Sequence, residues 1–304
     1  MGISMYFEYT IIKEGIRIDQ VKEQEDIILI PEKLEDRIVV ELGAYALAGS
    51  RALEIHLPLY LSRIGAYAFY NCERLRRIFC HSRIKDLGAG LFTGAKQIEF
   101  LDFTLWEQEH ACLQEMLSEL RQLLRVRIHG SQEARLLFPY YYEEMVENTP
   151  ARFLFTETHG CGHRYRYCFE KRQFQYREYD ALFSHARIQE PELLVTELAL
   201  GRLLYPCGLT SGHEKVYQDY ISRHWKAAGT LMIQTDCKRE YRWNNLERGL
   251  IPQFTSRYIT APEQISELIE EAQKEGHTEA VSWLMNFKHE KFPATASRRR
   301  RFEL

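Results

Sequence analysis

The sequence predicts an α+β protein in which a short solenoid of repeated units is followed by a β-hairpin and a mainly α-helical region. Three observations carry this expectation: a motif recurring every 22 or 23 residues in the N-terminal third, alternating apolar residues around a glycine-rich turn, and helical spacing of apolar residues beyond position 191. With 304 residues, 45% of them hydrophobic, the chain is long enough for two domains with their own cores. We expect a solenoid over residues 1–103, a capping helix and connector over 104–150, and a hairpin plus helical domain over 151–304.

The repeat is clearest as a six-residue motif. Leu42–Leu47 recurs as Ile64–Phe69 and, more loosely, as Leu87–Phe92, so that the motif glycines are 22 and then 23 residues apart. Apolar residues that begin short alternating runs keep the same step: Leu53, Leu75 and Ile98. A unit of this size cannot bury its own apolar face, whereas stacked neighbours can. The period therefore predicts a solenoid with one short strand in each unit.

Alternation along each strand divides its side chains between the core and the surface. We align the units on Ile55, Ile78 and Leu101 as inward residues. The adjacent outward positions are Glu54, Arg77 and Phe100 in one row and His56, Phe79 and Asp102 in the next. Because an aromatic residue beside an arginine often anchors an interface, these six residues are the candidate partner-binding surface. The alternative is that the connector, or a helix over 105–124, folds back and covers the aromatic side chains.

Further landmarks of the repeat are shared with a known family. Ile30-Pro31 and Leu57-Pro58 each close an alternating run, and the motif Ile64–Phe69 is followed by Cys72 and Leu75. This pattern, over roughly residues 8–103, resembles the BspA-like leucine-rich repeats. The resemblance implies a short leucine-rich-repeat solenoid that presents an extended surface to a protein partner and needs no catalytic pocket. Many members of that family are cell-surface proteins.

The middle of the chain changes pattern. Residues 105–124 carry apolar positions at helical spacing, which predicts a helix against the end of the solenoid. Residues 138–150 are interpreted as a connector with a short helix. Two alternating runs, 152–158 and 164–169, flank the glycine-rich stretch 159–163, and this arrangement predicts a β-hairpin.

The C-terminal part predicts helices. Apolar residues suit one helix over 193–204 and a second over 216–225. Near the end, a helix over 265–272, a stop at Gly276 and a second helix capped by Thr278 are similar to the helix pair of an ankyrin repeat. The tetrapeptide that usually opens such a repeat is absent. The order of the parts also resembles that of bacterial leucine-rich-repeat proteins.

Charge and composition exclude several classes of protein. A formal net charge of -3 recruits neither nucleic acid nor an anionic membrane. No run approaches the roughly 18 apolar residues of a membrane span, and Met1–Thr10 lacks the features of a secretory signal. The seven cysteines are scattered and odd in number, which fits buried thiols better than a disulfide framework. We therefore expect a cytoplasmic protein without membrane contact.

Four potential zinc ligands gather around the expected hairpin: His159, Cys161, His163 and Cys168. Closed zinc sites usually use two ligand pairs held apart by a folded segment, whereas three of these four crowd one turn. A hairpin loop with incidental histidines and cysteines explains them equally well. We expect no bound metal and no cofactor.

Cysteine–histidine catalysis has Cys207, His213 and Cys237 as its candidates. A nucleophile needs a base within hydrogen-bond reach and a third group that orients the base, and no motif marks such a set. No glycine-rich phosphate loop or paired-carboxylate motif is present. We expect a protein that is not an enzyme and takes no small-molecule substrate.

The leading hypothesis is a non-catalytic scaffold for protein–protein interaction, with another protein as its partner. The competing hypothesis is a nucleic-acid-associated regulatory protein that uses residues 163–179, where basic and aromatic side chains interleave. A half-buried sheet with aromatic residues inward explains that alternation as well. The run Arg298–Arg301 is interpreted as a solvated tail, with a functional patch as the less favoured alternative. The salt dependence of binding distinguishes the two hypotheses, because affinity that rests on phosphate contacts falls steeply with ionic strength.

Overall fold

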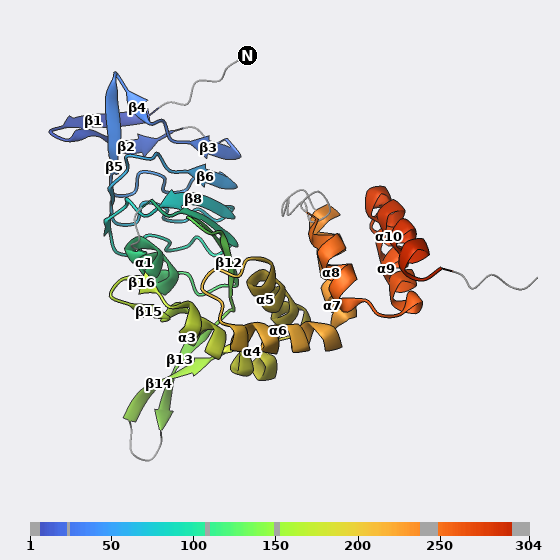
Figure 1. Ribbon diagram of the computed structural model, residues 1–304. Coiled ribbons are helices and arrows are strands. Elements are labelled where there is room, and N and C mark those ends of the chain that lie inside the picture. Colours follow the sequence, from blue (N-terminus) through green and yellow to red (C-terminus); the bar gives the residue numbers. More distant parts are fainter. Residues whose placement is uncertain (1–6, 23–24, 107–109, 149–152, 238–248, 294–304) are drawn as a thin grey trace, which may run out of the picture. The chain divides into compact units, whose positions relative to one another are not determined.

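The computed structural model describes residues 7–22, 25–106, 110–148, 153–237 and 249–293 (Figure 1). They belong to two compact units, Met1–Glu214 and Lys215–Leu304, and each unit is described by itself. This division does not coincide with the boundaries expected near residues 103 and 150.

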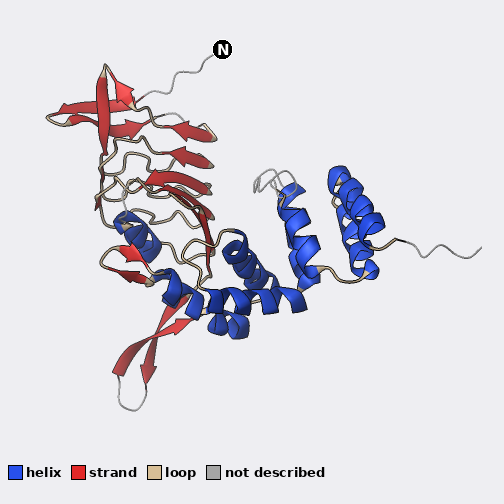
Figure 2. Ribbon diagram, in the orientation of Figure 1, coloured by secondary structure: helices blue, strands red, loops and turns tan. Residues whose placement is uncertain are grey.

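The first unit begins with a solenoid that contains two β-sheets (Figure 2). The larger, the main sheet, has the strand order β12-β11-β10-β8-β6-β3. Its strands are β3 Ile27–Leu29, β6 Glu54–His56, β8 Arg77–His81, β10 Phe100–Thr104, β11 Leu124–His129 and β12 Ala134–Phe138. The first five of these run parallel to one another, and β12 is antiparallel to β11.

The second sheet contributes the other wall of the solenoid. Its strands are β1 Phe7–Ile12, β2 Gly15–Val21, β4 Lys33–Leu34, β5 Arg37–Leu42, β7 Arg63–Ile64 and β9 Asp86–Leu87. β1 and β2 form an antiparallel hairpin, β4 pairs antiparallel with β5, and β2, β5, β7 and β9 form a parallel ladder. Each parallel strand therefore belongs to a successive unit of the repeat.

The solenoid core is built from the inward side chains of these strands. In the main sheet, those that are almost fully buried are Ile28, Ile55, Ile78, Leu101 and Val126. The inward row expected from the sequence is thus confirmed. The motif aromatics Phe69 and Phe92 also point inward and stack with their ring centroids 5.5 Å apart. At Gly65 a Cβ atom would collide with the backbone nitrogen of Ala44 in the preceding unit, so close stacking of the units requires glycine there.

A helix caps the series of backbone hydrogen bonds that joins the turns of successive six-residue motifs. Between units, backbone N–H groups of one turn donate to carbonyls of the next, as from Tyr67 to Ala89. After the last turn, the carboxylate of Glu119 accepts from the N–H groups of Gly90 and Phe92 at 3.0 and 3.1 Å. Glu119 lies at the end of α1, Ala111–Glu119. The Glu119 carboxylate thus supplies the acceptors that the carbonyls of another repeat unit would supply, which is the role of a cap.

The helix expected over 105–124 is shorter than predicted. It spans Ala111–Glu119, and residues 124–129 form strand β11, which continues the main sheet beyond the expected end at Phe103. Leu124, Val126 and Ile128 alternate and are buried, so their period is that of a strand. The predicted helix extended to residue 124 because Leu124 also fits the helical spacing of the preceding apolar residues.

The rest of the first unit corrects the hairpin prediction. Its elements are β13 Tyr142–Asn148, β14 Phe153–His159, α2 Gly162–Arg166, β15 Phe169–Glu170, β16 Gln173–Phe174, α3 Tyr176–Ala181, α4 Phe183–Gln189 and α5 Glu192–Leu204. The strand expected over 152–158 is present, but its partner is β13, in the segment interpreted as a connector. The expected second strand, 164–169, is wrong because most of it lies in or just after helix α2. Helix α5 packs on β12.

The second unit is helical among its described residues. Its helices are α7 Trp225–Cys237, α8 Leu250–Tyr258, α9 Pro262–Lys274 and α10 Thr278–Lys291, preceded by α6 Ser211–Arg223, which begins before the division. Within the unit, α7 packs on α8 and α9, and α9 packs on α10. Gly276 ends α9 with a φ of 72°, as expected, but the imidazole of His277, not Thr278, caps α10 by accepting from the Ala280 N–H. No helix in the described part of the chain is long and apolar enough to span a bilayer.

A candidate protein-binding face on the main sheet

The outward side chains of the main sheet form two continuous rows. Strand pairing places Glu54 opposite Arg77 and Arg77 opposite Phe100, and it places Phe79 between His56 and Asp102. These are the rows expected from the alignment of the repeats. We call the surface formed by the outward residues of β3, β6, β8 and β10 the outer face.

Strand β3 adds an apolar border to the outer face. Ile27 and Leu29 pair with Glu54 and His56, so they continue the two rows. Their side chains are 50% and 54% exposed, which is unusual for residues of their size in a sheet. The sequence prediction missed both, although their alternation with buried Ile28 was visible.

Aromatic rings on the outer face are held in place by stacking. The imidazole of His56 lies parallel to the ring of Phe79, with centroids 3.9 Å apart. The guanidinium of Arg77 lies over the ring of Phe100, 4.8 Å from its centroid. Both phenylalanines remain half-buried, and each keeps part of its ring accessible. The face therefore offers ordered aromatic surface to a partner.

Charges on the outer face compensate one another. Glu54 accepts from His56 at 2.6 Å and lies 3.5 Å from Arg77. Asp102 lies within 4 Å of three cationic or titratable groups, those of Arg77, Arg127 and His129. A surface with both signs interleaved favours a protein partner over a polyanion, because it has no excess of positive charge.

Helix α1, within the segment expected to cover the outer face, lies on the other side of the sheet. Met116 of α1 contacts the inward side chain of Cys80, with their sulfur atoms 3.9 Å apart, so α1 packs on the core side of β8. Helix α5 instead covers the outward side of β12 and β11, at the end of the main sheet beyond the outer face. There Glu197 forms a two-pronged ion pair with Arg125 on β11, one hydrogen bond being 2.7 Å long.

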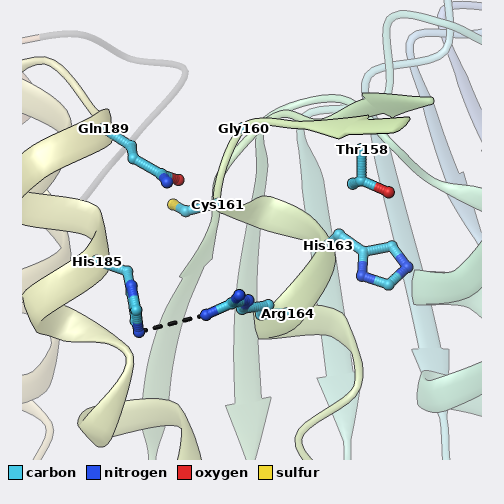
Figure 3. Close-up of a pocket in the computed structure, with 7 residues that line it drawn as sticks. All are labelled: Thr158, Gly160, Cys161, His163, Arg164, His185 and Gln189. Carbon is cyan, nitrogen blue, oxygen red and sulfur yellow. Dashed lines mark hydrogen bonds between the residues drawn. The ribbon is translucent and has the colours of Figure 1, made fainter. Parts of the chain in front are cut away.

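A pocket of about 350 Å³ lies at the turn between β14 and α2 (Figure 3). It is lined by Thr158, Gly160, Cys161, His163, Arg164, His185 and Gln189. In Figure 3 the guanidinium of Arg164 reaches toward His185, 3.3 Å away, and Cys161 lies on the side of Gln189, away from His163. The Cys161 thiol donates to the Glu190 carboxylate at 3.0 Å. Burial, together with this carboxylate, raises the pKa of Cys161, so the thiol stays protonated and is a poor nucleophile.

The four potential zinc ligands do not converge. His159 stacks on Tyr142 with centroids 4.6 Å apart, and His163 packs against Tyr141 and Tyr167. The Cys168 thiol donates to a backbone carbonyl, that of Arg164. Over the ranges that the structure describes, no group of three or more histidine, cysteine or acidic side chains is arranged to hold a metal ion.

Two of the other cysteine–histidine candidates have separate partners among the described contacts. His213 contacts the Thr210 hydroxyl through Nδ1 at 3.2 Å, near the start of α6. Cys207 is half-buried and lies beside Tyr176, whose pKa is raised by burial and by that thiol. The side chain of Cys237 lies outside the described residues.

Of the lysines and arginines in residues 163–179, Arg166 is buried, whereas Arg164, Lys171, Arg172 and Arg177 are exposed. Arg166 is 1% exposed and donates to four backbone carbonyls: those of Leu120, Gln122, Pro139 and Gly162. Tyr165 and Tyr179 are fully buried, with ring centroids 4.8 Å apart. The nucleic-acid hypothesis therefore gains no support from a two-stranded surface, because residues 162–166 form a helix and Tyr165, Arg166 and Tyr179 belong to the core. Residues 298–301 lie outside the described part of the chain.

Comparisons with known proteins agree with the repeat. Residues 30–131 match the family model of the BspA type leucine rich repeat region, in six copies. The chain therefore contains a BspA-type leucine-rich-repeat region, a β-solenoid followed by helices. A search of the curated proteins found no match.

Solved structures with some likeness to the chain include three bacterial proteins. A leucine rich cell surface protein from Faecalibacterium prausnitzii is 17% identical with a TM-score of 0.29, over 34% of this chain and 34% of that one. A leucine-rich repeat protein from Bacteroides ovatus is 22% identical with a TM-score of 0.29, over 34% and 30% of the two chains. The leucine rich repeat protein of T. pallidum is 16% identical with a TM-score of 0.24, over 32% and 68%. The aligned part spans about a third of the first two proteins.

Proposed function

We propose that this chain is a non-catalytic scaffold that binds another protein through the outer face of its solenoid. Leucine-rich-repeat regions generally serve protein–protein interaction or surface binding, and they do so with extended sheet surfaces. The observation that carries the proposal is the ordered, half-exposed pair of Arg77 and Phe79 beside the exposed side chains of Ile27 and Leu29. Aromatic and arginine side chains of this kind dominate binding energy at interfaces.

Rigidity supports this proposal. The residues of the outer face stand on parallel strands whose inward neighbours are buried, and their rings and charges already contact one another. Little side-chain freedom is therefore lost on binding, and less of the interaction energy is offset by ordering. The partner is expected to present an apolar patch toward β3 and mixed charges toward Glu54 on β6 and Arg77 on β8.

The test compares capture of proteins from a lysate of the native organism by the wild type and by Arg77→Ala/Phe79→Ala. A matched control is Tyr60→Ala/Arg63→Ala, which removes one exposed aromatic residue and one exposed arginine away from the main sheet. We expect the first variant to lose the proteins that the wild type and the control retain. Equal capture by both variants would contradict the proposal, and capture lost on nuclease treatment or in high salt would favour nucleic acid.

A cytoplasmic location is part of the proposal. Six cysteines with described side chains are free, and five of these are buried. Compartments that keep thiols reduced are where such cysteines are usual. Fractionation of cells with an antibody against the chain tests this, and recovery from the cell surface would overturn it.

The helical unit is proposed to pack as ankyrin-like pairs. Support comes from the contacts of α7 with α8 and of α9 with α10, together with the contact between the first helices of the two pairs. Ile265, Leu268 and Leu284 are buried as this packing needs. An experimental structure of the whole chain tests the idea: the two pairs should superpose as successive repeats, and failure to superpose would exclude it.

A further inference from the structure

Strands β13 and β14 form an arm that no other sheet continues. They pair over seven residues in an antiparallel ribbon, which is a separate two-stranded sheet, and Figure 1 shows it projecting from the first unit. A two-stranded ribbon by itself is only marginally stable in water, because it has no third strand or helix to cover it. Both edges of the arm carry backbone groups available for another strand.

Both faces of the arm expose large apolar side chains. Met145 and Leu154, on one face, are 73% and 67% exposed. Phe155, on the other face opposite Val146, is also exposed. Surface of this kind is typical of a segment that is covered by a partner.

The arm is acidic, and its charge indicates a partner with positive charge. The strands β13 and β14 contain four glutamates and no lysine or arginine: Glu143, Glu144, Glu147 and Glu157. At the base of the arm, Glu143 pairs with Arg121 at 2.9 Å. Further out, Glu144 stands opposite Glu157, and like charges in such positions repel each other. Added positive charge would relieve this repulsion.

We propose that the arm docks on an extended, basic segment of a protein partner, which adds as a third strand along β13. Because side chains alternate between the two faces of a strand, lysine or arginine side chains of that segment lie beside Glu144 on one face of the arm, and its apolar side chains cover Met145 on the other face. Backbone hydrogen bonds to the free edge supply affinity, and the alternate side chains supply specificity. The outer face is a different surface, so this docking is separate from the proposed function.

The same charges disfavour the other occupants of such an edge. A second copy of the chain would bring β13 against β13, with Glu144 and Glu147 of both copies close together. Nucleic acid and anionic membranes carry the same sign of charge as the arm. A basic protein segment is the occupant whose charge complements the edge.

The test uses the full chain and a synthetic peptide in which lysine and valine alternate. We expect the peptide to bind and to slow hydrogen exchange of amides on β13, while a peptide of alternating glutamate and valine does not. Glu144→Gln/Glu147→Gln should weaken binding about tenfold or more. The matched control is Glu170→Gln/Glu178→Gln, which neutralises two exposed glutamates outside the arm and should leave affinity unchanged.

A further variant checks the apolar part of the site. Met145→Ser should lower the affinity for the lysine–valine peptide with little effect on thermal stability, since this side chain is mostly exposed. If the wild type and Glu144→Gln/Glu147→Gln bind the peptide with equal affinity, the proposal is overturned. It is also overturned if the peptide slows hydrogen exchange of amides away from β13 instead. Self-association through the arm, seen by sedimentation and lost on Met145→Ser, would identify a second copy instead and would also overturn it.

Discussion

The repeats and the segment that follows them hold their charged side chains in opposite ways. In the repeats, the side chains of Glu54 and Arg77 on the outer face are 23% and 25% exposed, and backbone hydrogen bonds join each unit to the next. Among the described residues from 120 to 205, several charged side chains are instead buried among protein acceptors, as with Arg166 and the pair Asp180–Arg202. The repeats spread their polar contacts over many equivalent bonds. The later segment depends on a few side chains that join parts of the chain far apart in sequence.

The later segment is therefore the part whose stability is sensitive to single substitutions, and the outer face is the part that tolerates them. A buried arginine that satisfies several carbonyls cannot be replaced without leaving them unpaired. A half-exposed arginine on a sheet surface can be replaced at small cost, because water takes over its contacts. Binding residues are therefore expected where stability depends least on the individual side chain.

The largest expected effect is at Arg166. Arg166→Met leaves the carbonyls of Leu120, Gln122, Pro139 and Gly162 without this donor, and we expect a loss of about 3–5 kcal/mol in the free energy of unfolding. Urea unfolding of the full chain measures it. Arg164→Met is the control, since that side chain is exposed two residues away. A loss of less than about 1 kcal/mol at Arg166 would mean that the segment does not depend on single buried charges.

A smaller effect is expected at the cap of the solenoid. Glu119→Ala removes the acceptor of two backbone N–H groups, those of Gly90 and Phe92, and should cost about 1–2 kcal/mol. Ser118→Ala in the same helix is the control, because the Ser118 hydroxyl bonds only within α1 among the contacts described. Hydrogen exchange should also speed up in the last motif turn. Unchanged exchange there would contradict the capping role of Glu119.

The pH dependence of stability should be smaller again. Burial lowers the pKa of His81, whose Nε2–H donates to Pro58 at 2.8 Å while Nδ1 accepts from the Arg83 N–H. The unfolded chain binds the proton more readily, so stability is complete above the unfolded pKa of about 6.5 and falls as the pH drops below it. Unfolding measured from about pH 7.5 to about pH 5.5 should show this fall, with a shallower slope in His81→Gln. An identical slope in the variant would exclude His81 as a cause.

The smallest effect on stability is expected on the outer face. Arg77→Ala/Phe79→Ala should change the free energy of unfolding by less than about 1 kcal/mol, because both side chains are partly exposed and the arginine pairs at the surface. Thermal unfolding measures the change. A loss of several kcal/mol would place Phe79 in the core, since truncating a buried phenylalanine costs about 3–5 kcal/mol.

The two regions also differ in how far the sequence predicts them. In the repeats, each strand pairs with the equivalent strand of the next unit, so aligning Ile55, Ile78 and Leu101 was sufficient to place both outward rows. In the later segment, Tyr165 and Tyr167 alternate like strand residues, yet Arg166 between them is buried and donates to carbonyls of two distant segments, at Leu120 and Gln122 and at Pro139. No local pattern contains that information.

The candidate site shows the same limit. Its six central residues followed from the period, but the edges of the outer face did not. Exposure of Ile27 and Leu29 follows from β3 being the last strand of the sheet, which depends on what the chain does before it. Coverage of the other end depends on the ion pair of Arg125 with Glu197, which are 72 residues apart in sequence.

The measurement that tests the binding face most directly is site-specific photo-crosslinking. A photoreactive phenylalanine analogue is placed at position 79 on the outer face or at position 60 away from it, in otherwise unchanged protein. We expect position 79 to form a discrete crosslink to a protein partner in the native lysate, Arg77→Ala to reduce it, and position 60 to form none. Crosslinks of equal yield from both positions, or a crosslink from position 60 alone, would contradict the claim that the outer face binds the partner.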